Sequence, residues 1–595
     1  MRVIPVGGPP PQLYQASDVL KKPRGPQQFT DVVQRLRRLH RNSVLVIGSR
    51  MLWHMWNHPE PLKESDSGWM GNRITQMYAE RIISLACIYC SAHNRPPMRE
   101  VDFRLLCWEL YSCEDENPFG PDAAALLKAR LQDLDPTSSL RALDPQLAPY
   151  LLGVALKARV ISEQSIGRYW DGGSLVRSYL IARELRALGL KSTAKRAQVH
   201  LAKTYKQAEK GKTNDDELID YETVERRFFL TSMAEAYRAL WILYVKANDG
   251  ARRELQGPTG PIWEHDPGRI LLNETASEEE VLGKLGLAGG GLRAAASRLS
   301  IRLSECSALR AELEAVEPKW QRYAPQVDWL TRWPIIDLES GGPCEHLLAP
   351  SPWRLMLAFN ERVLFSFVQF LEQEGGLHEP PPSVRGTAFA SYLSKVLKGV
   401  PNFYDVDALV GSEEAGKRPD FLWVGEQFGV LVEAKFSLRP NSDRGLKDMS
   451  AALTAWDRAA EPLNQAREFL SVHLPRLEAR LREPRRWVLA VVTSESLVEE
   501  SLGFRGIVKA GNLLSGTGLQ SLVMMTPGQL EEWALNSDAD AFARRAIEVY
   551  TEFDPSLLKP VPVLGRPTIG KLRSPPHIAD AWAELFGKRL EVEET

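Results

Sequence analysis

The spacing of apolar residues changes near residue 340. From about residue 31 to 255 it follows the i, i+3, i+4 period of amphipathic helices, as in DVVQRLRRLH and NRITQMYAERIISLACIYC. Beyond residue 345, apolar runs of strand length alternate with helical segments. At 595 residues the chain is also too long for a single hydrophobic core. We therefore predict a multidomain chain: a flexible lead-in over residues 1–30, an all-α region over 31–340, and an α/β domain with a mixed sheet over 345–595.

The first region contains further helical patterns. SLVRSYLIARELRALGL and FFLTSMAEAYRALWILYVKA both place apolar residues on one helical stripe. A glycine-rich break at residues 286–291 is predicted to open a single long helix, and residues 352–374 are predicted as another helix. The break lacks the Lys-Ser/Thr ending of a phosphate-binding loop, which argues against a nucleoside triphosphatase.

The second region has the order helix, three strands, helix, two strands. The predicted helices are TAFASYLSKVLKG (387–399) and residues 451–481. The predicted strands are NFYDVDALV (402–410), DFLWV (420–424), FGVLVEAKFS (428–437), RRWVLAVVTS (485–494) and LQSLVMMT (519–526).

Asp420, Glu433 and Lys435 interrupt two segments that otherwise have the composition of buried strands. Side chains two residues apart on a strand point to the same face, so Glu433 and Lys435 are expected to project together. A tight connection at GEQFG would form a hairpin and bring Asp420 beside Glu433. Two adjacent carboxylates raise each other's pKa, and a divalent cation removes that penalty. Because oxygen ligands favour a hard ion, the predicted cofactor is Mg²⁺ or Mn²⁺.

A lysine beside such an ion site has a use in hydrolysis. Lys435 could orient and help deprotonate the water that attacks phosphorus, while the cation stabilises the developing charge. The three charged residues together therefore indicate hydrolysis of a phosphodiester. A different interpretation is a surface hairpin in which Glu433 and Lys435 form a solvated pair on a wet face.

These residues resemble the signature of the PD-(D/E)XK nuclease superfamily, whose members share a restriction-endonuclease-like core. The dipeptide PD at 419–420 is followed, after twelve residues, by EAK at 433–435. The resemblance implies that Asp420 and Glu433 ligate the metal ion. It also implies that the backbone carbonyl of Ala434 completes the ion site and that Lys435 is the catalytic lysine. The order of elements is similar as well, and the resemblance covers residues 386–530.

One helix downstream extends the resemblance. NQAREF places Gln465 and Phe469 one turn apart, similar to the Gln-x-x-x-Tyr helix of the RecB-exonuclease-like branch. This implies that Gln465 orients the site or touches the substrate, whereas Phe469 has no hydroxyl to match the Tyr. Family members often carry a Glu on the leading helix where this chain has Ala390. The candidate replacements for that acid are Asp405, Asp407 and Glu361.

Cysteine content and the absence of long apolar stretches bear on location. Six cysteines are too sparse for a disulfide framework and indicate a reducing, intracellular setting. No stretch approaches the ~20 apolar residues of a membrane span, and MRVIPVGGPPPQLYQ contains no signal peptide. We expect a cytoplasmic protein with no membrane partner. Several side chains are expected to pack in the core rather than bind zinc: Cys87, Cys90, Cys107, Cys113, His54 and His58.

A basic stretch at residues 191–212 contains seven Lys and Arg residues and one Glu. It could contact a phosphate backbone, although an acidic stretch follows it and a solvated helix face is the simpler interpretation. The net charge of the whole chain is −2, so no overall basic field points to a nucleic-acid partner.

The predicted function is metal-dependent hydrolysis of DNA. DNA is favoured over RNA because the resembled family acts mostly on DNA. A nuclease-like domain joined to a large helical recognition or regulatory region resembles the effector of a prokaryotic anti-phage or anti-plasmid system. A DNA repair or recombination nuclease is the alternative with the same chemistry. A catalytically decayed fold that binds nucleic acid or protein as a scaffold is the alternative of another class. A homodimer or a partner protein is compatible with each interpretation.

Overall fold

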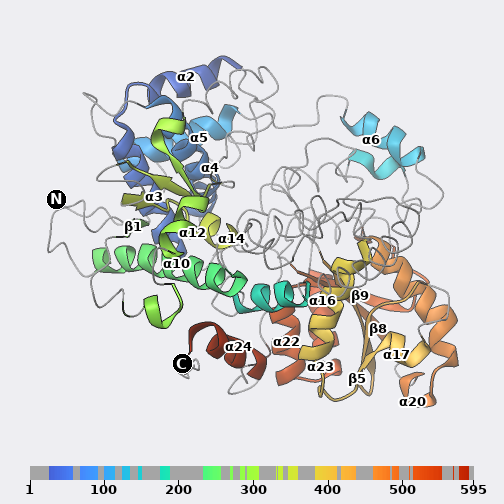
Figure 1. The fold of residues 1–595 in the computed structure, drawn as a ribbon. Helices are drawn as coiled ribbons and strands as arrows, with labels where there is room; N and C mark the ends of the chain where they lie inside the picture. The colour runs from blue at the N-terminus through green and yellow to red at the C-terminus, as the bar shows by residue number, and fades with distance from the viewer. Residues whose placement is uncertain are drawn as a thin grey trace, which may run out of the picture.

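A computed structural model describes the protein over most of its helices and strands. Helices dominate the described residues, and the strands form two mixed sheets (Figure 1). The described residues are 26–57, 67–90, 99–113, 123–133, 145–149, 175–185, 187, 232–255, 268–272, 280, 282–287, 291–306, 330, 333–339, 346–358, 382–411, 417–436, 460–482, 486–494, 508–509, 513–552, 564, 567 and 575–587.

Helices before the second sheet follow the predicted apolar periodicity. They are α2 (Pro26–Leu36), α3 (Arg41–Asn57), α4 (Ser67–Tyr89), α5 (Glu100–Cys113), α6 (Ala123–Gln132), a helix over residues 175–185, α10 (Met233–Leu255), α12 (Gly291–Leu299) and α14 (Pro352–Ala358). The four helical patterns quoted from residues 31–255 are confirmed where they are described. The basic stretch at 191–212 and most of the predicted helix 352–374 lie outside the described residues.

Helices α2 to α5 share a hydrophobic core, drawn in blue in Figure 1. Leu36, Leu52 and Phe103 are fully buried in it. Ile336 and Leu348, from two strands more than 200 residues further along the chain, pack into the same core. The helical region therefore includes strands.

These strands form a four-stranded sheet of three-residue strands. They are β1 (Arg269–Leu271), β2 (Ser300–Arg302), β3 (Ile335–Asp337) and β4 (His346–Leu348), in the order β1-β4-β3-β2. The prediction of an all-α region is wrong here, and the predicted long helix after residue 291 ends at Leu299 and is followed by β2. Strands this short contain too few residues to show an alternating pattern. Because β4 pairs with β1 and β3, this sheet joins residues on both sides of the predicted 340–345 boundary.

The second sheet has five strands in sequential order. They are β5 (Phe403–Asp405), β6 (Phe421–Val424), β7 (Phe428–Lys435), β8 (Arg486–Thr493) and β9 (Leu519–Met525). Strands β5, β6 and β7 are antiparallel neighbours, whereas β7, β8 and β9 run parallel. The parallel pairing of β7 and β8 requires a long crossover, and the helix over residues 460–468 lies in it.

The helices around this sheet complete the α/β arrangement. They are α16 (Pro382–Val396), α17 (Val406–Val410), α20 (Ala479–Arg482), α22 (Pro527–Asn536), α23 (Ala539–Glu552) and α24 (Pro576–Phe586). The predicted strand 402–410 is wrong after Asp405, because the Asp405 side chain accepts a hydrogen bond from the Ala408 amide at 3.1 Å and starts α17. The predicted helix 451–481 is described from residue 460 and contains a π-helical turn at Phe469–His473.

Both faces of the five-stranded sheet are buried, in two different cores. One face packs against α16, α22 and α23 through Trp423, Val430, Val432 and Ala490. The other face packs against the helix over residues 460–468 through residues that include Leu422, Leu431, Leu489, Leu463 and Ala466. A sheet covered on both faces explains why its strands read as nearly continuous apolar runs.

The hairpin of β6 and β7 is held by a carboxylate from α23. Asp540 accepts hydrogen bonds from the backbone amides of Glu426, Gln427 and Phe428 at 3.0, 3.0 and 2.8 Å. These are the amides of the turn, which the strand ladder leaves without partners. The contact therefore satisfies the amides of the turn.

A close approach of two strands occurs at Gly429 and Trp487, which are register partners in β7 and β8. A Cβ atom at Gly429 would lie 2.1 Å from the Trp487 ring. Position 429 therefore accepts only glycine while the indole occupies this place.

Helix α10, the helix over residues 175–185 and the last described helix, α24, share one core. Trp241 of α10 contacts Trp582 of α24 with ring centroids 5.2 Å apart, and α10 and α24 run beside each other in Figure 1. Tyr179, from the helix over 175–185, packs on Tyr237 of α10.

Candidate active site

Asp420 and Glu433 are neighbours across the β6–β7 hairpin. The register pairs Phe421 with Val432, so the next cross-strand pair is Asp420 and Glu433. The hydrogen bond from the Ala434 amide to Asp420 Oδ2, at 2.7 Å, extends this pairing. The predicted tight connection between the two strands thus brings the two carboxylates to one place.

Lys435 completes the cluster on the same face. Its Nζ lies 2.8 Å from Glu433 Oε1 and 3.3 Å from Glu461 Oε2. Glu461 belongs to the helix over residues 460–468, which covers this face of the sheet. The cluster therefore joins two strands and one helix.

The site lies in the interior of the sheet rather than at its edge. Strand β7 has β6 on one side and β8 on the other, and the Glu433 residue is 3% exposed. The interpretation of a surface hairpin with a solvated pair is therefore wrong.

Burial makes ionisation of the two carboxylates less favourable and raises their pKa values. Burial raises the pKa of Asp420 to about 6, against a lowering by the Ala434 amide and by Lys435. Burial, followed by repulsion from Asp420, raises the pKa of Glu433 to about 8. The ammonium group of Lys435 lowers both pKa values, but by less than burial raises them. The single positive charge therefore does not compensate the two carboxylates.

Burial alone would lower the pKa of Lys435, but the carboxylates of Glu433 and Glu461 outweigh burial and raise it. The amine is therefore a charged hydrogen-bond donor at neutral pH. In this state it can orient a water molecule or a phosphate oxygen.

Two carboxylates are available for a hard cation. Glu433 Oε2 is buried and has no hydrogen-bond partner among the described residues. Across the described part of the chain, no three His, Cys, Asp or Glu side chains converge as a metal-binding group. A cation at Asp420 and Glu433 would need backbone carbonyl and water oxygens as its further ligands, and Mg²⁺ is commonly bound in this way. The carbonyl of Ala434 stays a prediction for that role.

Gln465 lies four residues after Glu461 and therefore on the same helix face. Its Oε1 atom is buried without a hydrogen-bond partner among the described residues. Phe469, the position of the family Tyr, is fully buried in the core under the sheet. The side chain at 469 therefore serves packing.

Two of the acids considered as a replacement at Ala390, Asp405 and Asp407, lie near enough to Asp420 to raise its pKa by repulsion, but both have other roles. Ala390 is on α16, which packs on the opposite face of the sheet. Asp405 caps α17, and Asp407 pairs with Arg418 at 2.7 Å. Glu361 lies outside the described residues. The acid that does reach the cluster, Glu461, was missed. Its sequence signal is the Glu-x-x-x-Gln spacing on the helix that follows the EAK strand.

The cysteines pack as predicted. Cys87, Cys90 and Cys107 are buried in the core of helices α2 to α5. Burial raises the pKa of Cys90 to about 12 and raises those of Cys87 and Cys107 too. These thiols therefore pack as protonated, apolar side chains in the core. The side chain of Cys113 and residue His58 lie outside the described residues.

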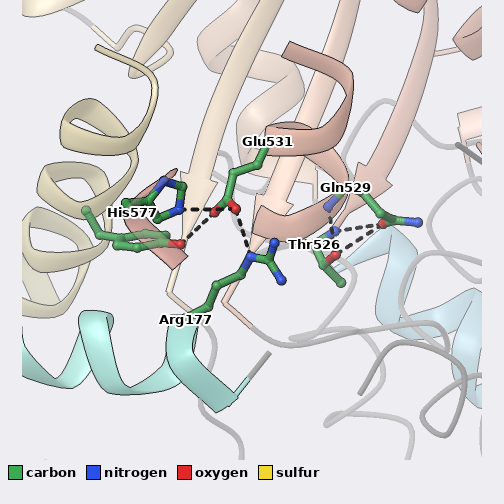
Figure 2. A network of polar contacts seen from close by, with 6 residues as sticks. Arg177, Thr526, Gln529, Glu531 and His577 are labelled. Carbon is green, nitrogen blue, oxygen red and sulfur yellow. Dashed lines mark hydrogen bonds and ion pairs between the residues drawn. The ribbon is translucent and has the colours of Figure 1, made fainter. Parts of the chain in front are cut away.

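A second buried carboxylate, Glu531 on α22, lies in a different setting (Figure 2). It accepts hydrogen bonds from Arg177 Nε at 2.8 Å and from the Tyr392 hydroxyl at 2.6 Å. His577 Nε2 lies 3.4 Å away. Burial would raise the pKa of Glu531, but Arg177, His577 and Tyr392 together lower it. The sequence offered no signal for this network, whose members come from four separate elements.

Comparison with known proteins leaves the geometry as the basis for function. The chain matches no known protein family, no curated protein and no solved structure. Among the described helices, none has the length and apolar character needed to cross a membrane.

Proposed function

We propose that this chain is a metal-dependent nuclease that hydrolyses phosphodiester bonds of DNA. The observation that carries the proposal is the cluster of Asp420, Glu433 and Lys435, in which a half-buried and a buried carboxylate with raised pKa values lie beside one ammonium group. Buried charged groups that a fold does not neutralise are uncommon away from functional sites.

The arrangement of the second sheet supports the same proposal. From α16 to β8 the described order is a leading helix, three antiparallel strands with the short helix α17 between the first two, a crossover containing a helix, and a strand parallel to the third. This is the order that the resemblance to the PD-(D/E)XK superfamily implies. The position of the acidic residues at the ends of β6 and β7 agrees with that resemblance.

The residues divide the chemistry between them. Asp420 and Glu433 would hold a divalent Mg²⁺ or Mn²⁺ ion, with the Ala434 carbonyl as a further ligand. When bound, such an ion lowers the pKa of water and stabilises negative charge on phosphate. Lys435 Nζ, as a charged donor, orients the attacking water or a phosphate oxygen. Gln465, with its unpartnered Oε1, lies on the same helix as Glu461 and is assigned to substrate or water contact.

The experiment is cleavage of a supercoiled plasmid by the full-length protein in Mg²⁺ or Mn²⁺, with a chelator as the blank. We expect nicked or linear product from the wild-type chain and none from Glu433→Ala or Lys435→Ala. Glu426→Ala is the matched control, because Glu426 lies exposed in the turn of the same hairpin. Equal cleavage by all four proteins would point to a contaminating nuclease and would contradict the proposal.

The scaffold alternative is favoured by one observation: within the described residues, no three His, Cys, Asp or Glu side chains converge as a metal-binding group. It predicts that the wild-type chain binds DNA and never cuts it under either metal. Defence against phage or plasmids, with DNA repair as the alternative setting, belongs to the proposal and rests on the architecture of the chain alone.

A further inference from the structure

Lys435 has two carboxylate partners, and only one of them belongs to the strand motif. Nζ lies 2.8 Å from Glu433 Oε1 and 3.3 Å from Glu461 Oε2. The second partner comes from the helix over residues 460–468. The amine is therefore held from two directions, by the strand beneath it and by the helix above it.

Stability does not explain the place of Glu461. Its side chain is 43% exposed, and ion pairs of such exposure contribute about 0–1 kcal/mol. Its charge also repels Glu433, which Asp420 already repels. A carboxylate that adds repulsion to the acidic pair of Asp420 and Glu433 and gains little stability calls for another reason.

Binding of a cation by Glu433 would explain why a second carboxylate lies beside Lys435. Glu433 Oε2 is buried and has no hydrogen-bond partner among the described residues, so this carboxylate has an oxygen to offer. With Glu433 engaged in that way, its attraction for Lys435 is weakened and the ammonium is repelled by the added positive charge. Among the described residues, Glu461 is then the remaining carboxylate in contact with Nζ.

We propose that Glu461 is a positioning residue that keeps Lys435 Nζ directed at the reacting phosphate while Glu433 is engaged elsewhere. This inference rests on the proposed function and deepens it. It assigns to Glu461 no contact with substrate and no ligand bond to the cation.

The first experiment compares Glu461→Gln with the wild-type chain in steady-state plasmid cleavage. We expect kcat to fall about ten- to a hundredfold, the usual effect of removing a partner that orients a catalytic group. The KM for DNA and the Mg²⁺ concentration for half-maximal rate are expected to stay within about twofold. Glu461→Asp should behave like Glu461→Gln, because the shorter side chain keeps the charge and loses the contact.

The matched control is Glu468→Gln, which removes the same charge seven residues along the same helix. Seven residues are two turns, so the two positions share a helix face. A kcat of Glu468→Gln within about twofold of wild type is expected, and a fall as large as that of Glu461→Gln would overturn the inference.

A second readout does not use activity. Lysine acylation, mapped by mass spectrometry in excess Mg²⁺, reports how freely Lys435 moves and reacts. We expect acylation of Lys435 to rise several-fold in Glu461→Gln, with the exposed Lys398 as an unchanged internal reference. Unchanged acylation at Lys435 would overturn the inference.

The outcomes separate the inference from the proposed function. A wild-type chain that never cuts DNA overturns the proposed function and the inference together. A wild-type chain that cuts, beside a Glu461→Gln variant with equal kcat, overturns the inference alone. A tenfold loss of Mg²⁺ affinity in Glu461→Gln would make Glu461 a ligand, which also overturns it.

Discussion

Glu433 and Glu531 are both buried glutamates next to a cationic side chain, yet their surroundings act in opposite directions. Arg177, Tyr392 and His577 surround Glu531 and lower its pKa. Glu433 has one ammonium partner, an acidic neighbour and an oxygen without a partner, and its pKa is raised to about 8. Breaking a buried charge pair by removing one partner costs stability, whereas a buried charge that the fold itself leaves incomplete is retained for another use. The comparison separates a structural carboxylate from a candidate catalytic one.

The largest expected effect on stability is at Glu531. Glu531→Gln removes the charge that pairs with the half-buried Arg177 Nε at 2.8 Å, so we expect the free energy of unfolding to fall by about 3–5 kcal/mol. Urea denaturation followed by circular dichroism measures the change. Glu552→Gln, at the exposed end of α23, is the control and should shift stability by under about 0.5 kcal/mol. In the same assay Glu433→Gln should be neutral or stabilising. A loss at Glu433 as large as that at Glu531 would remove the distinction between the two sites.

Addition of Mg²⁺ should stabilise the protein through the Asp420–Glu433 cluster and not through the Glu531 network. At a hundred times the dissociation constant, binding stabilises the folded chain by about 2.7 kcal/mol. We expect this stabilisation in the wild-type chain and in Glu531→Gln, and its loss in Asp420→Asn and Glu433→Gln. Thermal unfolding with and without the ion is the measurement. Stabilisation that survives in Glu433→Gln would place the ion elsewhere in the protein.

The pH dependence of stability should follow the sign of the Glu531 shift. Its folded-state pKa lies below the ordinary 4.5, so its contribution is complete above pH 4.5 and is lost as the pH falls through the folded-state value. Each unit of lowering is equivalent to about 1.4 kcal/mol. The difference in unfolding free energy between wild type and Glu531→Gln should therefore shrink in acid. A difference that grows as the pH falls would contradict this assignment.

The smallest effect is expected at Asp540, a carboxylate satisfied by backbone amides rather than by charge. Asp540→Ala should cost about 1 kcal/mol, because water can replace the carboxylate at the exposed amides of the turn. Denaturation gives the value, and Asp538→Ala, at the cap of the same helix, gives a comparison of similar size. A loss above about 3 kcal/mol would mean that the turn controls the whole hairpin.

The sequence was sufficient to predict the hairpin that carries Asp420 and Glu433. It was not sufficient to predict which side chains of the covering helix approach that hairpin. Period-two alternation and the short turn predict that Asp420 and Glu433 lie side by side, because pairing within a hairpin is local. The approach of Glu461 to Lys435 depends on how a later helix crosses the sheet, which no local pattern encodes. Arg177 and Glu531 are 354 residues apart, and either of the adjacent Glu531 and Glu532 could have been the buried one.

Predictions of the shortest strands and of one strand end were wrong for a different reason. Three-residue strands such as β2 and β3 contain only one period of alternation, and they are held by the helices packed on them rather than by their own composition. Asp405 ended a strand that its apolar neighbours would have continued, since a single capping side chain outweighed the β preference of Val406 and Val410.

The contact between Gly429 and Trp487 has a consequence for how this protein can vary over time. A methyl group at 429 would collide with the indole 2.1 Å away, and a smaller residue at 487 would leave a void beneath β7. Neither substitution is tolerable by itself, so a lineage that loses one residue should have exchanged both. Among descendants of this chain, the pair should be inherited as a unit, as glycine with tryptophan or as a larger residue with a smaller one.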